Sequence, residues 1–188
     1  AFSTYPGFML HSADALDFDF ASLTTGDTHL RVVGNLPYNI STPLIFKLLE
    51  QAQIITDMHF MLQLEVVERL AASPGSKDWG RLGVMAQFRC EVEQLFEVPP
   101  EAFYPQPKVR SAVVRLTPHP EPPFPNVDPT SLGRVVTQAF SQRRKTLRNN
   151  FKGTLEDSDF GTLAIDPSAR AETLSITDLV AITVHLQG

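Results

Sequence analysis

Cysteine is almost absent from this 188-residue chain, and that scarcity excludes two kinds of protein. With Cys90 as its single cysteine, the chain can form neither an internal disulfide framework nor a multi-cysteine zinc site, and we expect no metal. No apolar run approaches the roughly 18 residues that span a bilayer. The first residues also lack the basic flank and apolar core of a signal peptide. We therefore expect a cytoplasmic protein without a membrane partner.

Acidic residues are missing from one long stretch, although the whole chain carries a net charge of -5. Between Asp128 and Glu156 there is no aspartate or glutamate. Six basic residues lie there, namely Arg134, Arg143, Arg144, Lys145, Arg148 and Lys152. Because salt limits the reach of each charge to about 10 Å, a local basic face on an acidic protein can still bind phosphate. A solvated helix face that binds nothing is equally compatible with this stretch.

The order of apolar patterns predicts an α/β fold, in which helices pack on a sheet that ends in an antiparallel pair. The expected strands cover Phe8–His11, Leu30–Gly34, Met58–Leu62, Cys90–Val98 and Ser111–Leu116. The expected helices cover residues 44–52, 65–72 and 82–89, with Ser41 and Thr42 as N-cap candidates for the first. Proline-rich residues 119–127 predict a linker between a sheet domain over residues 1–118 and a helical domain over 128–188. In that helical domain we expect helices at 132–140, 145–151 and 176–186.

The tetrapeptide Asn35-Leu36-Pro37-Tyr38 follows the second expected strand, at the end of the sheet where α/β proteins bind ligands. The Asn35 carboxamide can accept a hydrogen bond, and Pro37 fixes the backbone so that a neighbouring carbonyl can accept another. Tyr38 adds a flat aromatic face. These features suit a planar group with an exocyclic amine, which is a nucleobase. The tetrapeptide could also do no more than turn a strand into a helix.

The stretch from Asn35 to Leu44 resembles the fourth motif of the rRNA adenine dimethyltransferases, and more closely their small-subunit (KsgA/RsmA) type. The resemblance continues in segments within residues 57–67, 80–82 and 98–113, and it is strong in Phe140–Asn149. It covers nearly the whole chain from Asp14 onward. It implies a Rossmann-like class I methyltransferase domain followed by a small all-α C-terminal domain. It also implies S-adenosylmethionine as methyl donor.

The resemblance implies a role for each matching residue. Asp14 and Ala15 would contact the adenine of S-adenosylmethionine, and Asn35 would lie beside both the methyl donor and the target amine. Leu36 and Pro37 complete the catalytic motif, in which Tyr38 and Phe103 would close the two faces of the target adenine. Without the resemblance, Asp14 would be read as a helix cap and Phe103 as core.

The basic stretch becomes a candidate RNA-binding surface in the light of the resemblance. We expect a helix that carries Arg143, Arg144 and Arg148 near one side, with Lys145 turned away. Basic side chains at a helix start oppose the preference of the dipole for acidic residues, which suggests a use in binding phosphate. Lys108 is a further candidate RNA contact. The same segment could instead brace the two domains.

One expected feature of the family is missing. Its members begin with a Gly-rich loop and an acidic residue that hold the methyl donor, and no Gly-x-Gly spacing precedes Asn35. We therefore expect a fragment without the N-terminal strands, which by itself binds the donor weakly or not at all and is inactive.

For the intact protein, the resemblance implies dimethylation of two adjacent adenosines near the 3′ end of small-subunit (16S) rRNA. The partner would be the immature 30S subunit, and a monomer is expected. A non-catalytic RNA-binding assembly factor is one alternative. A large-subunit adenine methylase of the macrolide-resistance type is the other.

Overall fold

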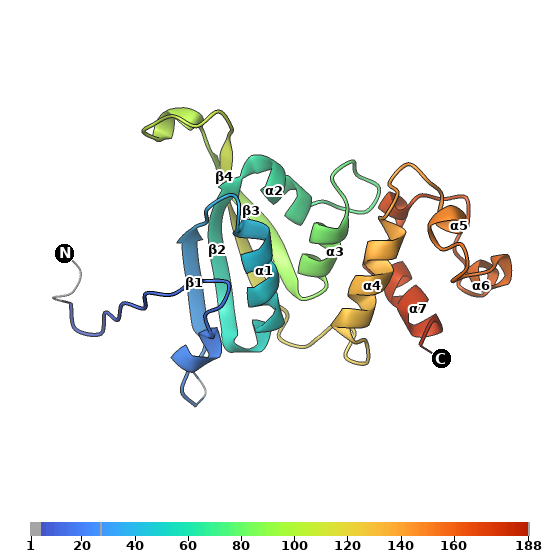
Figure 1. Cartoon of the computed structure of the whole chain (residues 1–188), viewed down its shortest axis with the longest axis horizontal. Coiled ribbons are helices and arrows are strands. Elements are labelled where there is room, and N and C mark those ends of the chain that lie inside the picture. The colour runs from blue at the N-terminus through green and yellow to red at the C-terminus, as the bar shows by residue number, and fades with distance from the viewer. Residues whose placement is uncertain (1–4, 27, 188) are drawn as a thin grey trace.

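A four-stranded mixed sheet forms the first part of the structure, a computed structural model that describes residues 5–26 and 28–187. Its strands are β1 (Leu30–Asn35), β2 (Ile55–Gln63), β3 (Cys90–Val98) and β4 (Ser111–Pro118), in the spatial order β1-β2-β4-β3. The β1 and β2 strands are parallel, whereas β4 is antiparallel to both β2 and β3. The predicted α/β sheet with an antiparallel pair at one end is therefore confirmed (Figure 1).

Helices α1 (Ser41–Glu50), α2 (Leu64–Leu70) and α3 (Arg81–Gln87) pack on one face of this sheet. The alternation of side chains along β2 explains the packing, since Met58, Phe60 and Leu62 are all buried in the shared core. On the opposite face of β1, Val33 is 78% exposed. The short 3-10 helices of this part are η1 (Phe20–Leu23), η2 (Ala52–Ile54) and η3 (Pro100–Ala102).

A second hydrophobic core lies among the helices that follow residue 128. These helices are α4 (Pro129–Ala139), α5 (Leu147–Asn150), α6 (Asp157–Thr162), η4 (Ala171–Thr173) and α7 (Ile176–His185). Helix α3 contacts both cores, because Leu82 belongs to the first core and Val84 to the second. Trp79, just before α3, is fully buried and donates its indole N–H to the carbonyl oxygen of Leu174 at 2.8 Å. The two parts therefore pack against each other through α3 and α4 (Figure 1).

Residues 119–127 contain neither helix nor strand, as the proline cluster predicts. The segment still packs on the helical core, where the rings of Phe124 and Phe88 stack with their centroids 6.0 Å apart. Asp128 then caps α4 by accepting hydrogen bonds from the backbone N–H groups of Thr130 and Ser131. Among the described residues, none of the helices is both long and apolar enough to cross a membrane.

Three local predictions are wrong. Phe8–His11 forms no strand, because it pairs with no strand among the described residues, and Leu10 is 82% exposed. Ser41 and Thr42 are not N-caps. Ile40 holds that position, and the Ser41 hydroxyl instead donates to the carbonyl oxygen of Tyr38 at 3.1 Å. The expected helix over 145–151 is shorter, since residues 141–145 form turns and α5 begins only at Leu147.

Helix α6 has no counterpart in the sequence predictions. Its six residues include three polar or acidic side chains in the first three positions, and Phe160 is its one buried residue. No apolar periodicity could develop over so short a segment. The Asp159 carboxylate accepts a hydrogen bond from the backbone N–H of Glu156 at 2.7 Å, which stabilises the start of the helix.

Candidate functional site

A pocket of about 390 Å³ lies at the C-terminal end of β1. The end of β2 and the start of β4 lie at the same end of the sheet. Its walls come from two segments that are distant in sequence. The lining residues are Asn35, Leu36, Pro37, Tyr38, Phe103, Tyr104, Pro105 and Pro107. The four residues of the predicted motif and Phe103 are thus brought together, as their predicted roles require. Figure 1 shows the loop between β3 and β4 projecting beyond this end of the sheet.

Backbone contacts to β2 fix the position of Asn35 and Leu36. The N–H of Leu36 donates to the carbonyl oxygen of Met61 at 3.3 Å, and the Leu36 side chain is buried in the sheet core. Gly34 allows this packing, because a Cβ atom there would lie 3.0 Å from Cδ2 of Leu36. Within the described residues, neither the Asn35 carboxamide nor the Leu36 carbonyl takes part in a hydrogen bond. Two acceptors are therefore open to a ligand at the mouth of the pocket.

Tyr38 presents a half-exposed ring, 46% accessible, on the side of the pocket next to α1. Its hydroxyl lies 3.5 Å from the hydroxyl oxygen of Ser111, a buried residue at the start of β4. Its backbone carbonyl accepts the hydrogen bond from Ser41 described above. The hydroxyl contact restrains the ring itself, and the hydrogen bond from Ser41 restrains the backbone that carries it.

Phe103 comes from the loop between β3 and β4, and it is half-buried without belonging to either hydrophobic core. The interpretation as a core residue is therefore wrong. The base of the loop is fixed by an ion pair between Arg110 and Glu97 at 2.6 Å and by a hydrogen bond from Leu64 N–H to the Arg110 carbonyl at 2.9 Å.

Sequence reasoning did not assign a role to Tyr104, which also lines the pocket. The available signal was an aromatic residue inside a loop with four prolines.

Asp14 and Ala15 do not line this pocket. One carboxylate oxygen of Asp14 accepts a hydrogen bond from the Leu16 N–H at 2.8 Å, and the Asp14 carbonyl accepts two more from Asp17 and Phe18. Asp14 therefore acts as a cap, as the alternative interpretation predicts, but it caps a turn and not a helix. The ammonium of Lys47 on α1 donates to the Leu16 carbonyl at 2.5 Å, which holds this turn against the first core. Neither the second carboxylate oxygen nor the N–H of Ala15 has a hydrogen-bond partner among the described residues.

The predicted basic residues differ in how far they are already paired within the chain. Arg143 donates to the carbonyl of Lys77 and lies 3.5 Å from the carboxylate of Glu172. Arg144 and Lys145 are exposed and have no ion-pair partner in the described parts of the chain. Because residues 141–145 form turns, the expected arrangement of Arg143 and Arg144 on a helix is wrong. These side chains instead project from a turn between α4 and α5.

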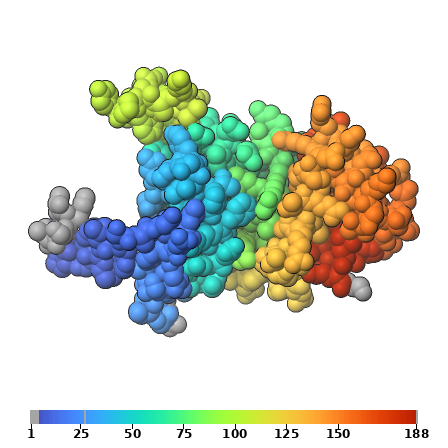
Figure 2. All heavy atoms as spheres, in the orientation of Figure 1, coloured from blue at the N-terminus to red at the C-terminus, as the bar shows by residue number. Residues whose placement is uncertain are grey.

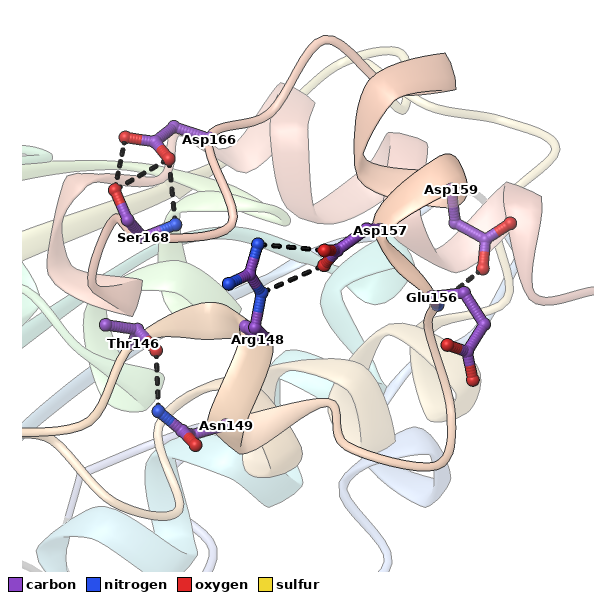
Figure 3. Close-up of polar contacts among 8 residues, drawn as sticks. All are labelled: Thr146, Arg148, Asn149, Glu156, Asp157, Asp159, Asp166 and Ser168. Carbon is purple, nitrogen blue, oxygen red and sulfur yellow. Dashed lines mark hydrogen bonds and ion pairs between the residues drawn. The ribbon is translucent and has the colours of Figure 1, made fainter.

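Arg148 is engaged by a carboxylate of the neighbouring helix. Its guanidinium forms two hydrogen bonds of 2.9 Å with Asp157 at the start of α6 (Figure 3). This bidentate geometry joins α5 to α6, occupies the Nε–Nη2 edge of the guanidinium and neutralises much of its charge. Lys108, by contrast, is exposed beside the pocket residue Pro107 and has no ion-pair partner within residues 5–26 and 28–187.

The lone thiol offers no reactive group to this site. Cys90 is buried at the start of β3, and that burial raises its pKa to about 12. A thiol with such a pKa remains protonated and inert near neutral pH. Among the described residues, no group of three or more His, Cys, Asp or Glu side chains is placed to hold a metal ion.

Comparison with known protein families matches residues 1–187 to the family described as ribosomal RNA adenine dimethylase. The ribosomal RNA small subunit methyltransferase A of Chromohalobacter salexigens is 59% identical over 98% of this chain and 67% of its own length. The protein of the same name from Pseudomonas aeruginosa is 60% identical over 95% of this chain and 67% of its own length. The chain therefore spans about two thirds of the length of these relatives.

Two solved structures share the fold. A dimethyladenosine transferase from Plasmodium falciparum superposes with a TM-score of 0.83 and 22% identity, covering 99% of this chain and 74% of that protein. The 23S rRNA methyltransferase ErmE gives a TM-score of 0.68 and 21% identity, covering 94% of this chain and 70% of that protein. The mixed sheet with its helices is thus consistent with the predicted Rossmann-like methyltransferase fold.

Proposed function

Because this chain belongs to the ribosomal RNA adenine dimethylase family, we propose that the protein it represents methylates adenosines of small-subunit rRNA. The methyl donor would be S-adenosylmethionine, and the products would be two adjacent N6,N6-dimethyladenosines near the 3′ end of that RNA. The observation that carries the proposal is the pocket itself, which gathers Asn35, Tyr38 and Phe103 around a space for one planar group. The protein would act as a monomer, in the cytoplasm, on the immature 30S subunit.

The open acceptors of the pocket suit the exocyclic amine of adenine. The amine is a poor nucleophile because its lone pair is delocalised into the ring. If the Asn35 carboxamide oxygen and the Leu36 carbonyl each accept one N–H, the hydrogens are held out of the ring plane and the lone pair becomes available. This role is positioning and electrostatic stabilisation, which needs no strong base.

The two aromatic walls hold the base. Tyr38 would stack on one face of the adenine and Phe103 would close the other, with the base extruded from its RNA strand. Stacking on an aromatic side chain contributes about 1–3 kcal/mol per base, which offsets much of the cost of extrusion. The contact between the Tyr38 and Ser111 hydroxyls would keep the Tyr38 ring in the stacking orientation.

The turn at Asp14 offers a donor and an acceptor that fit the edge of an adenine. The unpaired carboxylate oxygen of Asp14 can accept an amine hydrogen, and the unpaired N–H of Ala15 can donate to a ring nitrogen. These residues would hold the adenine of S-adenosylmethionine, and Asn35 would lie beside its methyl group. When bound, S-adenosylmethionine supplies an activated methyl on a sulfonium.

The helical residues 128–188 would form a separate small domain after the linker at 119–127, and the sheet part would form a methyltransferase domain over residues 1–118. Exposed basic residues of both parts, Lys108, Arg144 and Lys145, are the best placed to contact RNA phosphates. Arg143 and Arg148 would act chiefly as internal braces, since both are paired within the chain.

The relatives favour this proposal over its two alternatives. The relatives with 59% and 60% identity are named for the small ribosomal subunit, which disfavours the large-subunit type. A non-catalytic assembly factor would not need two unpaired acceptors at the mouth of an aromatic pocket, and the chain retains both.

A substitution of Asn35 tests the proposal in the full-length protein. Asn35→Ala should lower methyl transfer to unmethylated small subunits by about 100- to 1000-fold, as the loss of one oxyanion-hole donor does in other enzymes. The dissociation constant for RNA should change less than twofold, because no phosphate contact is lost. Asn126→Ala, an exposed residue of the linker, is the matched control and should be fully active. Full activity of Asn35→Ala would show that its assigned role is wrong.

A further inference from the structure

Tyr104 is the most exposed large hydrophobic side chain in the described part of the chain, with an exposed fraction of 102%. A buried tyrosine removes about 150–250 Å² from water, and this one contributes none of that to the stability of the fold. Its hydroxyl also has no hydrogen-bond partner among the described residues. A single exposed aromatic residue needs no explanation by itself. Tyr104, however, lines the same pocket as Tyr38 and Phe103.

The loop that carries Tyr104 is held in one shape. Pro99, Pro100, Pro105 and Pro107 each fix a backbone φ angle. Two backbone hydrogen bonds, from Ala102 to Pro99 and from Phe103 to Pro100, close the turn before Phe103 at 3.1 and 3.2 Å. In Figure 2 the yellow-green spheres of this loop project from the body of the molecule. A loop restrained in this way presents the ring with less backbone entropy left to lose on binding.

The backbone conformation separates Tyr104 from Phe103. Phe103 is extended, with φ -119° and ψ 150°, so the side chains of residues 103 and 104 point to opposite sides of the chain. Phe103 is half-buried against the pocket, whereas Tyr104 is turned outward at its rim. Tyr104 is therefore not placed to close the face of the base that Phe103 would cover. A planar group on this ring would belong to a neighbouring nucleotide of the same strand.

We propose that Tyr104 stacks on the unpaired nucleotide next to the adenosine held in the pocket. The inference rests on the proposed function, and it adds a second contact to the RNA strand at the rim. For a pair of adjacent target adenosines, the neighbour would be one of the pair while the other reacts. Because every base has an aromatic face, this contact holds the strand without selecting its sequence.

Steady-state methylation by the full-length protein separates this contact from the chemical step. Tyr104→Ala should raise KM for unmethylated small subunits about 5- to 10-fold, the lower end of the effect of losing one stacked base, and leave kcat within about twofold. Tyr104→Phe and Tyr104→Trp should keep the low KM, because each retains a flat ring. Phe96→Ala is the matched control, since Phe96 is 58% exposed on β3 and lies outside the pocket. An unchanged KM in Tyr104→Ala would overturn the proposal.

A binding measurement tests the same stacking contact of Tyr104 without turnover. A short RNA with 2-aminopurine beside the target adenosine should lose fluorescence when the wild-type protein binds, because stacking on a ring quenches this base. The loss should persist in Tyr104→Phe and disappear in Tyr104→Ala. Equal quenching by wild type and Tyr104→Ala would contradict the stacking role. Quenching by a wild-type protein that transfers no methyl group would instead support the contact and refute the proposed function.

Discussion

Neutralising Arg144 and Lys145 together should weaken the salt dependence of RNA binding, because both side chains are exposed and have no ion-pair partner in the described parts of the chain. Each phosphate contact contributes about 0.7–0.9 to the slope of log K against log salt concentration. The double glutamine variant should therefore lose about 1.4–1.8 of that slope. Between about 50 and about 200 mM salt, its affinity should fall about tenfold less than that of the wild type.

Arg148→Gln is the matched comparison, since Arg148 lies in the same segment but is bound to Asp157 (Figure 3). Its slope should stay close to the wild-type value. The exposed ion pair that it loses contributes only about 0.2–1 kcal/mol, so the variant should remain folded. Asp157→Asn should have the opposite effect, because it releases the Arg148 guanidinium and can steepen the slope by up to about 0.7–0.9.

Fluorescence anisotropy with a labelled small-subunit rRNA fragment, titrated at several salt concentrations, measures these slopes. Equal slopes for wild type and the Arg144 and Lys145 double variant would refute the assignment of these two residues to phosphate. A slope for Arg148→Gln that falls as far as that of the double variant would show that pairing within the chain does not decide which cations meet RNA.

Two further predictions concern stability. Arg31 donates to Asp57 at 2.6–3.1 Å and, with nearby His59 and Arg115, lowers the pKa of that carboxyl. The ionised Asp57 therefore stabilises the fold above the usual aspartate pKa. This stabilisation is lost as the pH falls through the lowered pKa. Urea midpoints of Asp57→Asn should therefore depend less on pH below about 4 than those of the wild type, and parallel curves would contradict this origin. Asn150→Ala should lower the free energy of unfolding by roughly 1–3 kcal/mol in urea titration, because the buried Asn150 amide donates to the Ala139 carbonyl at 2.6 Å. The exposed Asn149→Ala should change it by less than about 0.5 kcal/mol, and equal losses would refute the burial argument.

The short-range pattern of the sequence determined most of the sheet and two of the three long C-terminal helical segments. Leu30–Gly34 is rich in β-branched residues and forms β1, and the alternation in Cys90–Val98 forms β3, because these preferences act over a few residues. The same reasoning failed at Phe8–His11, where an apolar run predicted a strand and the structure has none. A strand requires a hydrogen-bonded neighbour, and a local pattern does not say whether one exists.

The sequence alone predicted one of the two segments that form the candidate site. Asn35 to Tyr38 are consecutive, so their chemistry can be read directly from the chain, whereas the place of Phe103 beside them rested on resemblance alone. The tertiary structure supplies the cause. Antiparallel pairing of β2 with β4 sets Gln63 opposite Ser111, and this register brings the loop before β4 to the edge where β1 ends.

Which charges are free was decided only by the tertiary structure. In the sequence, Arg143, Arg144, Lys145 and Arg148 form one basic run within a stretch that lacks acidic residues. In the fold, Asp157 and Glu172 reach that run from α6 and η4 and pair with two of the four cations. Sequence alone determined that the run is basic, and the packing of distant carboxylates determined which members remain available to a ligand, because ion pairs depend on proximity in space.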